Sequence, residues 1–453
     1  MIKTIARSIY GDLPELIKDP LGSFLERARN PSGISPVRIG RRQSYLISDP
    51  AFIRRVLLEN FENYDKETPS YEAVQLVLGR GMFTSHGPLW KKNRKLAQPA
   101  FHGHRVQRFG PILERISRRF ADRWEGLCRR GEPVDASEDM MKITLEGVSE
   151  VLFGADISES SSEINRVFPV VLKNLAYRVT RPIRWPDWMP TQRNKEFKEA
   201  LGSLNRVVDG LIQKRRQRLA EIEAMTPDAR DLLSTLMLAQ DEETGERMSD
   251  AQLRDEVMTL MIAGHETTAN ALTWVWYLLD QHPEEADRLH QELHQEVGDR
   301  APTVGDLPRL KRLRMVISEA LRMYPPVWTF DRRAIAADML GTTKIAPGDL
   351  VIISPYAIQR NPAFWSDPDT FRPERFEPGQ EEQKNKFLFL PFGAGPRICL
   401  GQSFAMMESL LIMATLLSRF RARRWDSSPI KPRPVVTLRP SVPLLLRLEL
   451  KNS

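Results

Sequence analysis

The stretch from Ser249 to His282 constrains the fold more strongly than any other part of the chain. Ser249 and Gln252 have the spacing of a capping box, and the next strong stop signal is His282 followed by Pro283. We therefore expect one helix of about 30 residues, which at about 1.5 Å per residue is about 45 Å long. Its middle, MTLMIAGHETTANALTWVW, is apolar nearly all round. Such a helix is buried along most of its length, so the rest of the chain must pack around it.

A few polar residues interrupt this apolar helix: His265, Glu266, Thr267, Thr268 and Asn270. Burying such a group costs roughly a few kcal/mol unless it finds a partner. His265 and Glu266 begin like the zinc-protease motif His-Glu-x-x-His, but Ala269 stands where the second histidine would be. That kind of zinc site is excluded, and another function must account for the polar residues.

The remaining sequence predicts a mainly helical α+β protein. Residues 37–48 have the composition of strands, and a helix is expected to open at Asp49 and Pro50. After Pro326, short strands and prolines dominate, with turns at Gly341 and Gly348. No linker is visible, so we expect a single domain over residues 1–453. We expect its β-rich part mainly at 30–60 and 327–360, and its helical part mainly at 85–326 and 400–420.

Composition and charge limit the class of protein. The 453 residues are 41% hydrophobic and 28% charged, which is ordinary for a folded enzyme. Cys128 and Cys399 are the two cysteines, so there is no disulfide framework and no multi-cysteine metal site. The N-terminal sequence lacks the apolar run of a signal peptide or a membrane span, and we expect a cytoplasmic protein without a membrane anchor. The net charge of +7 is spread along the chain without a nucleic-acid-binding motif, which favours an acidic protein partner over nucleic acid.

A second informative stretch is FGAGPRICLG, residues 392–401. Its glycines free the backbone for tight conformations and let a flat group approach closely. A thiolate at Cys399 would be stabilised by the start of the helix expected from about Gln402, and Arg397 would pair with an acidic group of the ligand. A buried structural role is the commonest one for a free cysteine. The whole pattern instead indicates a thiolate that faces a flat ligand with a negatively charged group at its edge.

This segment resembles the haem-binding loop of the cytochrome P450 monooxygenases. The pattern Phe-x-x-Gly-x-Arg-x-Cys-x-Gly is matched by Phe392, Gly395, Arg397, Cys399 and Gly401. The resemblance implies the cytochrome P450 fold, with a large helical part and a small β-rich part around a buried haem b. It also implies that Cys399 binds the iron and that the cofactor is lined by Phe392, Gly393, Arg397 and Gly401.

Two further motifs resemble the structural triad of this family. Glu319 and Arg322, in SEALR, match its Glu-x-x-Arg pair, and Arg375, in FRPERF, matches the arginine that completes the triad. Residues three apart lie on one helix face and can pair, although most such pairs are solvated surface ion pairs of little worth. The resemblance implies that the triad is buried and holds the thiolate loop, so that breaking it causes loss of haem.

The sequence AGHETT resembles the oxygen-activating turn of the family. The resemblance implies that Ala263 and Gly264 lie against the cofactor and that Gly264 lets the helix pass close to dioxygen. It implies that Glu266 and Thr267 are catalytic, because the carboxyl supplies protons and the hydroxyl holds the reacting oxygen and a water. For Thr268, a hydrogen bond back to the helix carbonyls is the structural alternative.

Arginine and tryptophan motifs resemble the family's contacts to the haem carboxylates. Trp90 and Arg94 match Trp-x-x-x-Arg, and residues four apart share a helix face from which both can donate to one carboxylate. Arg332, in TFDRRAIAAD, matches the arginine that reaches the other carboxylate, with the adjacent Arg333 as an alternative.

The resemblance also implies partners. No flavin or ferredoxin domain is visible, so electrons are expected from a separate ferredoxin or flavodoxin with its reductase, and dioxygen is the second substrate. We expect a monomer whose docking face carries Lys91, Lys92, Lys95, Lys384 and Lys386 beside Arg94. Such a face steers an acidic partner, and a merely solvated basic surface is the alternative.

The substrate pocket is expected to be apolar. Family pocket positions fall on the loop before Trp90, the proline-rich segment 181–190, the central helix, the residues after Pro326 and a late turn. They place the following residues in the pocket: Tyr71, Val74, Leu78, Phe83, Ile262, Ala263, Val327, Trp328, Thr329 and Val442. We expect hydroxylation or epoxidation of a hydrophobic compound of secondary metabolism, such as a terpenoid, fatty acid, carotenoid or polyketide.

Two other functions fit a haem-thiolate protein. A peroxygenase or isomerase-like enzyme would not need the Glu266–Thr267 pair, because its reaction requires no proton delivery to dioxygen. A haem carrier or sensor would need neither that pair nor an apolar pocket.

Overall fold

The structure is a computed structural model, and it describes residues 11–39, 42–154, 160–180, 186–226, 230–379 and 385–451. The helices are α2 (Leu13–Lys18), α3 (Pro20–Ala28), α4 (Pro50–Arg54), α5 (Pro69–Leu78), α6 (Gly87–Ala97), α7 (Gly103–Gln107), α8 (Gly110–Arg129), α9 (Ala136–Phe153), α10 (Ser161–Thr180), α11 (Gln192–Gln217), α12 (Leu219–Ala224), α13 (Leu232–Leu238), α14 (Asp250–Gln281), α15 (Pro283–Glu296), α16 (Lys311–Met323), α17 (Pro355–Ile358) and α18 (Gln402–Arg419). The strands are β1 (Ile34–Ile39), β2 (Arg42–Ile47), β3 (Tyr64–Asp65), β4 (Val134–Asp135), β5 (Phe330–Ala334), β6 (Asp338–Leu340), β7 (Thr343–Ile345), β8 (Leu350–Ile353), β9 (Phe420–Arg424), β10 (Pro432–Pro434), β11 (Leu438–Pro440) and β12 (Leu445–Leu450).

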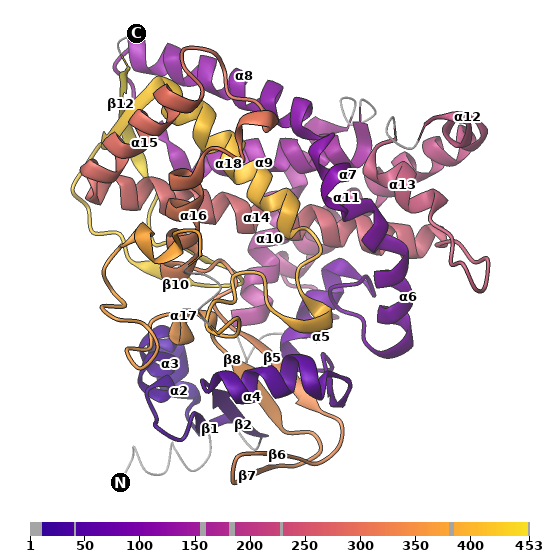
Figure 1. Cartoon of the computed structure of the whole chain (residues 1–453). Helices are drawn as coiled ribbons and strands as arrows, with labels where there is room; N and C mark the ends of the chain where they lie inside the picture. The colour runs from indigo at the N-terminus through magenta and orange to yellow at the C-terminus, as the bar shows by residue number, and fades with distance from the viewer. Residues whose placement is uncertain are drawn as a thin grey trace.

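The long central helix is confirmed as α14. The Gln252 backbone N–H donates to Ser249 Oγ at 3.3 Å, and the Ser249 backbone N–H donates to Gln252 Oε1 at 2.9 Å, which closes the predicted capping box. The helix ends at His282, as expected. It crosses the middle of the molecule and packs against α9, α11, α16 and α18 (Figure 1). The other helices therefore bury it on several sides, which explains its apolar composition.

The β-rich part brings together distant parts of the chain. A five-stranded sheet has the order β1-β2-β8-β5-β3, in which β2 and β8 run parallel and the other pairs run antiparallel. In Figure 1 most of this sheet lies at the end of the molecule opposite α8. The turns at Gly341 and Gly348 are confirmed, with φ values of 59° and 88°. The first closes the β6–β7 hairpin, which is inserted between β5 and β8.

The α+β, mainly helical class is confirmed. Helix α4 and the π-helix η1 (Arg55–Glu59) occupy the second half of the region 30–60. A three-stranded sheet of order β4-β12-β9 and the β10–β11 hairpin lie outside the two predicted β-rich ranges. Residues 186–191 connect α10 to α11 without helix, as the prolines predict, while residues 181–185 lie outside the described residues. None of the described helices combines the length and the apolar character that a membrane crossing requires.

Candidate active site

The segment Phe392–Gly401 is folded tightly against the η1 helix. The Cys399 backbone N–H donates to the Phe392 carbonyl at 2.9 Å, and the Ile398 N–H donates to the Gly395 carbonyl at 3.0 Å. Gly395 has a φ of 69°, and a Cβ there would lie 1.9 Å from the Leu57 carbonyl oxygen. Only glycine fits at this close approach. The motif glycine therefore fixes the path of the backbone that carries Cys399.

The Cys399 side chain is accessible, yet the protein atoms packed around it raise the pKa of this thiol by burial. The Gly401 backbone N–H and the Arg94 guanidinium act in the opposite direction and lower it. The Arg94 Nη1 donates to the Ile398 carbonyl at 2.9 Å, which holds this cation beside the sulfur. N–H groups and a cation close to the sulfur stabilise its thiolate form, which is the form that would bind a metal ion.

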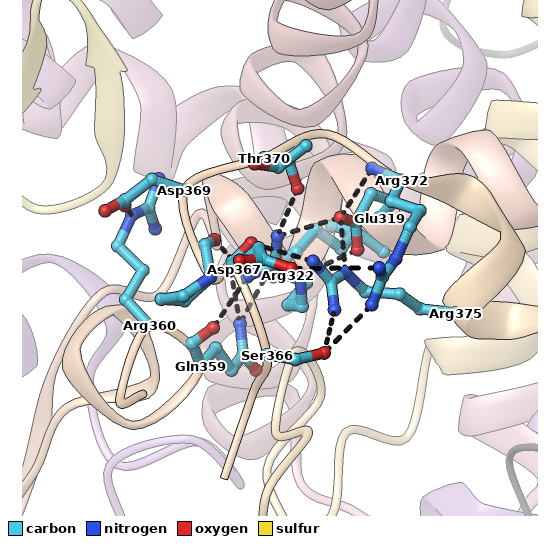
Figure 2. A network of polar contacts seen from close by, with 12 residues as sticks. Glu319, Arg322, Gln359, Arg360, Ser366, Asp367, Asp369, Thr370, Arg372 and Arg375 are labelled. Atoms are coloured by element: carbon cyan, nitrogen blue, oxygen red, sulfur yellow. Dashed lines mark hydrogen bonds and ion pairs between the residues drawn. The ribbon is translucent and has the colours of Figure 1, made fainter. Parts of the chain in front are cut away.

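Glu319, Arg322 and Arg375 form the predicted triad (Figure 2). Glu319 and Arg322 are completely buried, and the guanidinium donates to both carboxylate oxygens at 2.7 and 2.8 Å. Arg375 Nε donates to Glu319 Oε1 at 3.3 Å, and the Arg372 backbone N–H donates to the same oxygen at 3.0 Å. This fork is the geometry that satisfies a buried carboxylate.

Gln359, which the sequence did not single out, connects the triad to the thiolate loop. Its carbonyl accepts from Arg322 Nη1 at 2.8 Å, and its side chain donates to the Leu321 and Arg322 carbonyls at 3.1 and 2.9 Å. Its Oε1 accepts from the Leu390 backbone N–H at 2.8 Å. Leu390 lies just before the thiolate segment, so the backbone and side chain of Gln359 tie the triad to the loop.

A cluster of cations converges on Tyr71. Arg332 is buried and donates to the Tyr71 hydroxyl at 3.2 Å, whereas Arg333 pairs with Asp65 at 2.6 Å near the surface. The structure thus distinguishes the two adjacent arginines. Arg397 donates to the Ser85 carbonyl at 3.0 Å.

Lys66 is the third cation of this cluster, and sequence reasoning missed it. Its Nζ lies 4.8 Å from the centre of the Tyr71 ring and 4.6 Å from that of the Phe83 ring. Burial, Arg332 and Arg397 together hold the Lys66 pKa well below its ordinary value. Burial, with repulsion from Arg332, also lowers the pKa of Arg397 to about 10. Mutually repelling buried cations of this kind fit an anionic ligand.

The polar residues of α14 have partners outside the helix as well as within it. Glu266 is buried and accepts from Thr437 Oγ1 at 2.6 Å, and Asn270 donates to the same hydroxyl at 2.9 Å. The hydroxyl of Thr267 donates to the Ala263 carbonyl at 2.6 Å. Ala263 is exposed although Ile262 and His265 beside it are buried, so this position of α14 is accessible.

Two neighbouring residues of this turn face other helices. The hydroxyl of Thr268 faces the buried carboxyl of Glu408 on α18, whose pKa burial raises well above the ordinary value. It makes no hydrogen bond to a helix carbonyl. A Cβ at Gly264 would lie 3.1 Å from Val148 Cγ2, so the glycine permits the close packing of α9 against α14.

The predicted pocket residues are only partly brought together. Tyr71 and Phe83 are in contact, with ring centroids 5.5 Å apart. Trp328 Nε1 donates to the Val435 carbonyl at 3.0 Å, and Thr329 Oγ1 donates to the Ile353 carbonyl at 3.3 Å. Of the remaining members, Val74, Leu78 and Ile262 are buried, whereas Val327 and Val442 are exposed, as is Phe83.

Comparison with known proteins identifies the family. A cytochrome P450 family model matches residues 5–447. The chain belongs to the cytochrome P450 family. It is 36% identical to cyclooctatin synthase of Streptomyces melanosporofaciens, over 89% of this chain and 85% of that protein. It is 33% identical to cyclooctat-9-en-7-ol 5-monooxygenase of the same organism, over 92% of this chain and 88% of that protein.

A solved structure shares the fold. The crystal structure of the cytochrome P450DA heme domain superposes with a TM-score of 0.85 at 26% identity, covering 96% of this chain and 94% of that one. The protein is therefore a P450 monooxygenase that acts on a hydrophobic organic substrate. Membership of the family implies a haem-iron cofactor, dioxygen and a source of electrons.

The three α6 lysines of the expected docking face of this P450 are paired within the chain. Lys91 Nζ lies 2.6 Å from Glu62, and Lys95 Nζ lies 3.1 Å from Asp241 and 3.2 Å from Glu243. Lys92 pairs with Glu246 in the same 240–247 turn. Lys386 is exposed, and Lys384 lies outside the described residues. Much of the positive charge on α6 is therefore balanced internally.

Proposed function

We propose that this P450 hydroxylates or epoxidises a terpenoid, with haem b as its cofactor and Cys399 as the iron ligand. The observation that carries this proposal is the combination of an accessible thiol beside Arg94 with the cation cluster of Lys66, Arg332 and Arg397, which suits the cofactor's carboxylates. The terpenoid class is supported by the relatives, one of which is named for a monooxygenase reaction on cyclooctat-9-en-7-ol.

The residues on the page account for cofactor binding. Cys399 would hold the iron, and Arg332, Arg397 and Lys66 would pair with the carboxylates. Trp90 and Arg94 would support the same edge of the ring, and Ala263, Gly264, Phe392, Gly393 and Gly401 would line the cofactor. When bound, haem iron with a thiolate ligand supplies the dioxygen chemistry.

The protein's own contribution to the reaction is proton delivery and positioning. Thr267 donates to the Ala263 carbonyl, and this hydroxyl can turn toward the reacting oxygen when substrate and cofactor are present. Glu266 is held by Thr437, which fixes the carboxyl on the same turn of α14. We propose that these two groups move protons to the site, with Thr437 as a supporting hydroxyl.

We also propose an acidic ferredoxin or flavodoxin as the electron donor. The α6 lysines make exposed ion pairs that contribute only about 0–1 kcal/mol each, so an acidic partner can displace Glu62, Glu243 and Glu246. Single-domain organisation over residues 1–453, a monomeric state and a cytoplasmic location stay predictions.

Titration with candidate substrates tests the proposal. Purified haem-loaded protein is titrated with terpenoids, fatty acids, carotenoids and polyketides, and the spin state of the iron is followed by absorbance. A terpenoid is expected to give the largest shift and to be oxidised with reductase, ferredoxin and dioxygen. Equal turnover with hydrogen peroxide alone would support the peroxygenase alternative, and no shift with any compound would support a carrier or sensor.

A further inference from the structure

The segment from Gly79 to Ser85 crosses the N-terminal half of α14 at very close range. Gly79 has a φ of 59°, and a Cβ there would lie 2.1 Å from Asp255 Oδ1. A Cβ at Gly81 would lie 2.4 Å from Thr259 Oγ1 and 2.7 Å from the Asp255 carbonyl oxygen. Because Gly79 and Gly81 have no Cβ, this backbone can lie directly against the helix.

Two carboxyl groups of α14 hold the segment by its backbone. Asp255 Oδ2 accepts from the Arg80 N–H at 2.7 Å, and Glu256 Oε1 accepts from the Met82 N–H at 2.8 Å. Glu256 is 1% exposed, its other oxygen has no donor in the described part of the chain, and the Asn93 side-chain amide lies beside it. Burial raises the pKa of Glu256 to about 8, which favours its neutral form.

The other end of the segment is held by the cations of the cofactor site. Lys66 Nζ donates to the Phe83 carbonyl at 2.7 Å, and Arg397 donates to the Ser85 carbonyl at 3.0 Å. Phe83 contacts Tyr71 and belongs to the expected pocket wall. Glu256 lies seven residues before Ala263 on the same helix, which is about 10 Å along its axis. One rigid helix thus carries both the support of the pocket wall and the oxygen-activating turn.

We propose that Glu256, with Asp255, is a positioning residue that fixes the 79–85 segment, and through Phe83 the substrate, relative to the oxygen-activating turn of α14. The inference rests on the proposed function, since it concerns the same site. One oxygen of Glu256 accepts from the Met82 N–H, and the Asn93 side-chain amide lies beside the carboxyl group.

The test uses two probes that bind the haem iron through an imidazole nitrogen. Imidazole contacts little of the pocket wall, whereas 4-phenylimidazole extends its ring toward it. Their dissociation constants are measured by absorbance for the haem-loaded wild type, Glu256→Ala, Glu256→Gln and Gly81→Ala. Glu292→Ala is the matched control, because this carboxylate likewise accepts from backbone N–H groups, those of Arg312 at 2.6 Å and Leu313 at 3.0 Å, at the distant junction of α15 and α16.

Glu256→Ala is expected to raise the dissociation constant of 4-phenylimidazole about tenfold, because the buried Met82 N–H loses its acceptor. The dissociation constant of imidazole is expected to change less than about twofold. Glu256→Gln is expected to stay close to wild type, since its amide can both accept and donate. Gly81→Ala, which leaves Glu256 intact, should reproduce the loss, and Glu292→Ala should not. If Glu256→Ala does not retain haem, Gly81→Ala decides the question.

Wild-type affinity for both probes in Glu256→Ala or Gly81→Ala would overturn the inference and leave the proposed function standing. A Glu256→Gln variant as impaired as Glu256→Ala would also overturn it. A wild-type protein that gives no spectral response to imidazole would instead overturn the proposed function.

Discussion

Replacing Arg322 by methionine tests how strongly the thiolate loop depends on the buried triad. The guanidinium makes two hydrogen bonds to Glu319 and three to the carbonyls of Gln359, Pro368 and Thr370, at 2.8, 2.8 and 3.3 Å. Glu319 keeps Arg375 and the Arg372 N–H as partners, so its loss stays below the about 3–5 kcal/mol of a buried charge without any partner, while each carbonyl left without a donor costs about 1–3 kcal/mol. The three carbonyls alone sum to about 3 kcal/mol at the lower limit, compared with a total stability of about 5–15 kcal/mol.

We therefore expect Arg322→Met to be recovered with little or no haem, because the loop that carries Cys399 loses its support. The assay is the ratio of haem to protein after expression with excess haem, followed by urea unfolding. Arg314→Met is the matched control, since Arg314 is an exposed arginine on the same helix. A haem content and an unfolding free energy equal to those of the control would refute the argument.

Three further predictions concern titration and surface charge. The raised pKa of Glu408 means that the folded state keeps a proton that the unfolded chain releases above its ordinary pKa of 4.5, so wild-type stability falls by up to about 1.4 kcal/mol per pH unit as the pH rises. Glu408→Gln should flatten that slope in urea unfolding between about pH 5 and pH 7, and identical slopes would contradict the assignment. Burial lowers the pKa of His265 to about 4, so stability is lost as the pH falls below the ordinary value of 6.5, and His265→Gln should remove part of that loss. If the free energy of unfolding in urea falls with decreasing pH as steeply in His265→Gln as in the wild type, the His265 ring is not a neutral buried group. Glu243→Gln with Glu246→Gln should strengthen binding of an acidic ferredoxin severalfold at low salt, measured by calorimetry, because Lys92 loses its internal carboxylate partner and Lys95 keeps only Asp241. Unaltered affinity would mean that these lysines do not face the donor.

The sequence was informative where one local pattern dictates the structure. The capping box at Ser249 and the stop at His282 define α14 because helix ends are set by neighbouring residues. Glu319 and Arg322 could be paired in advance because a spacing of three places them on one helix face. The turns at Gly341 and Gly348 followed from a positive φ that glycine adopts without strain.

Residues that act through tertiary contacts were missed. Lys66 reads as a surface lysine, and only the folded chain places it between two aromatic rings and two arginines. Thr437 lies 171 residues from Glu266, so no local spacing links them. The pairing of Lys92 and Lys95 with residues 241–246 likewise depends on how α6 packs, which charge counts along the sequence cannot show.

The most direct test of the central claim is the absorption spectrum of the reduced, carbon-monoxide-bound protein. The account predicts the long-wavelength Soret band that marks a cysteine thiolate opposite carbon monoxide, and predicts its loss in Cys399→Ser. The same band in Cys399→Ser, or a wild-type protein that binds haem without ever showing it, would contradict Cys399 as the iron ligand.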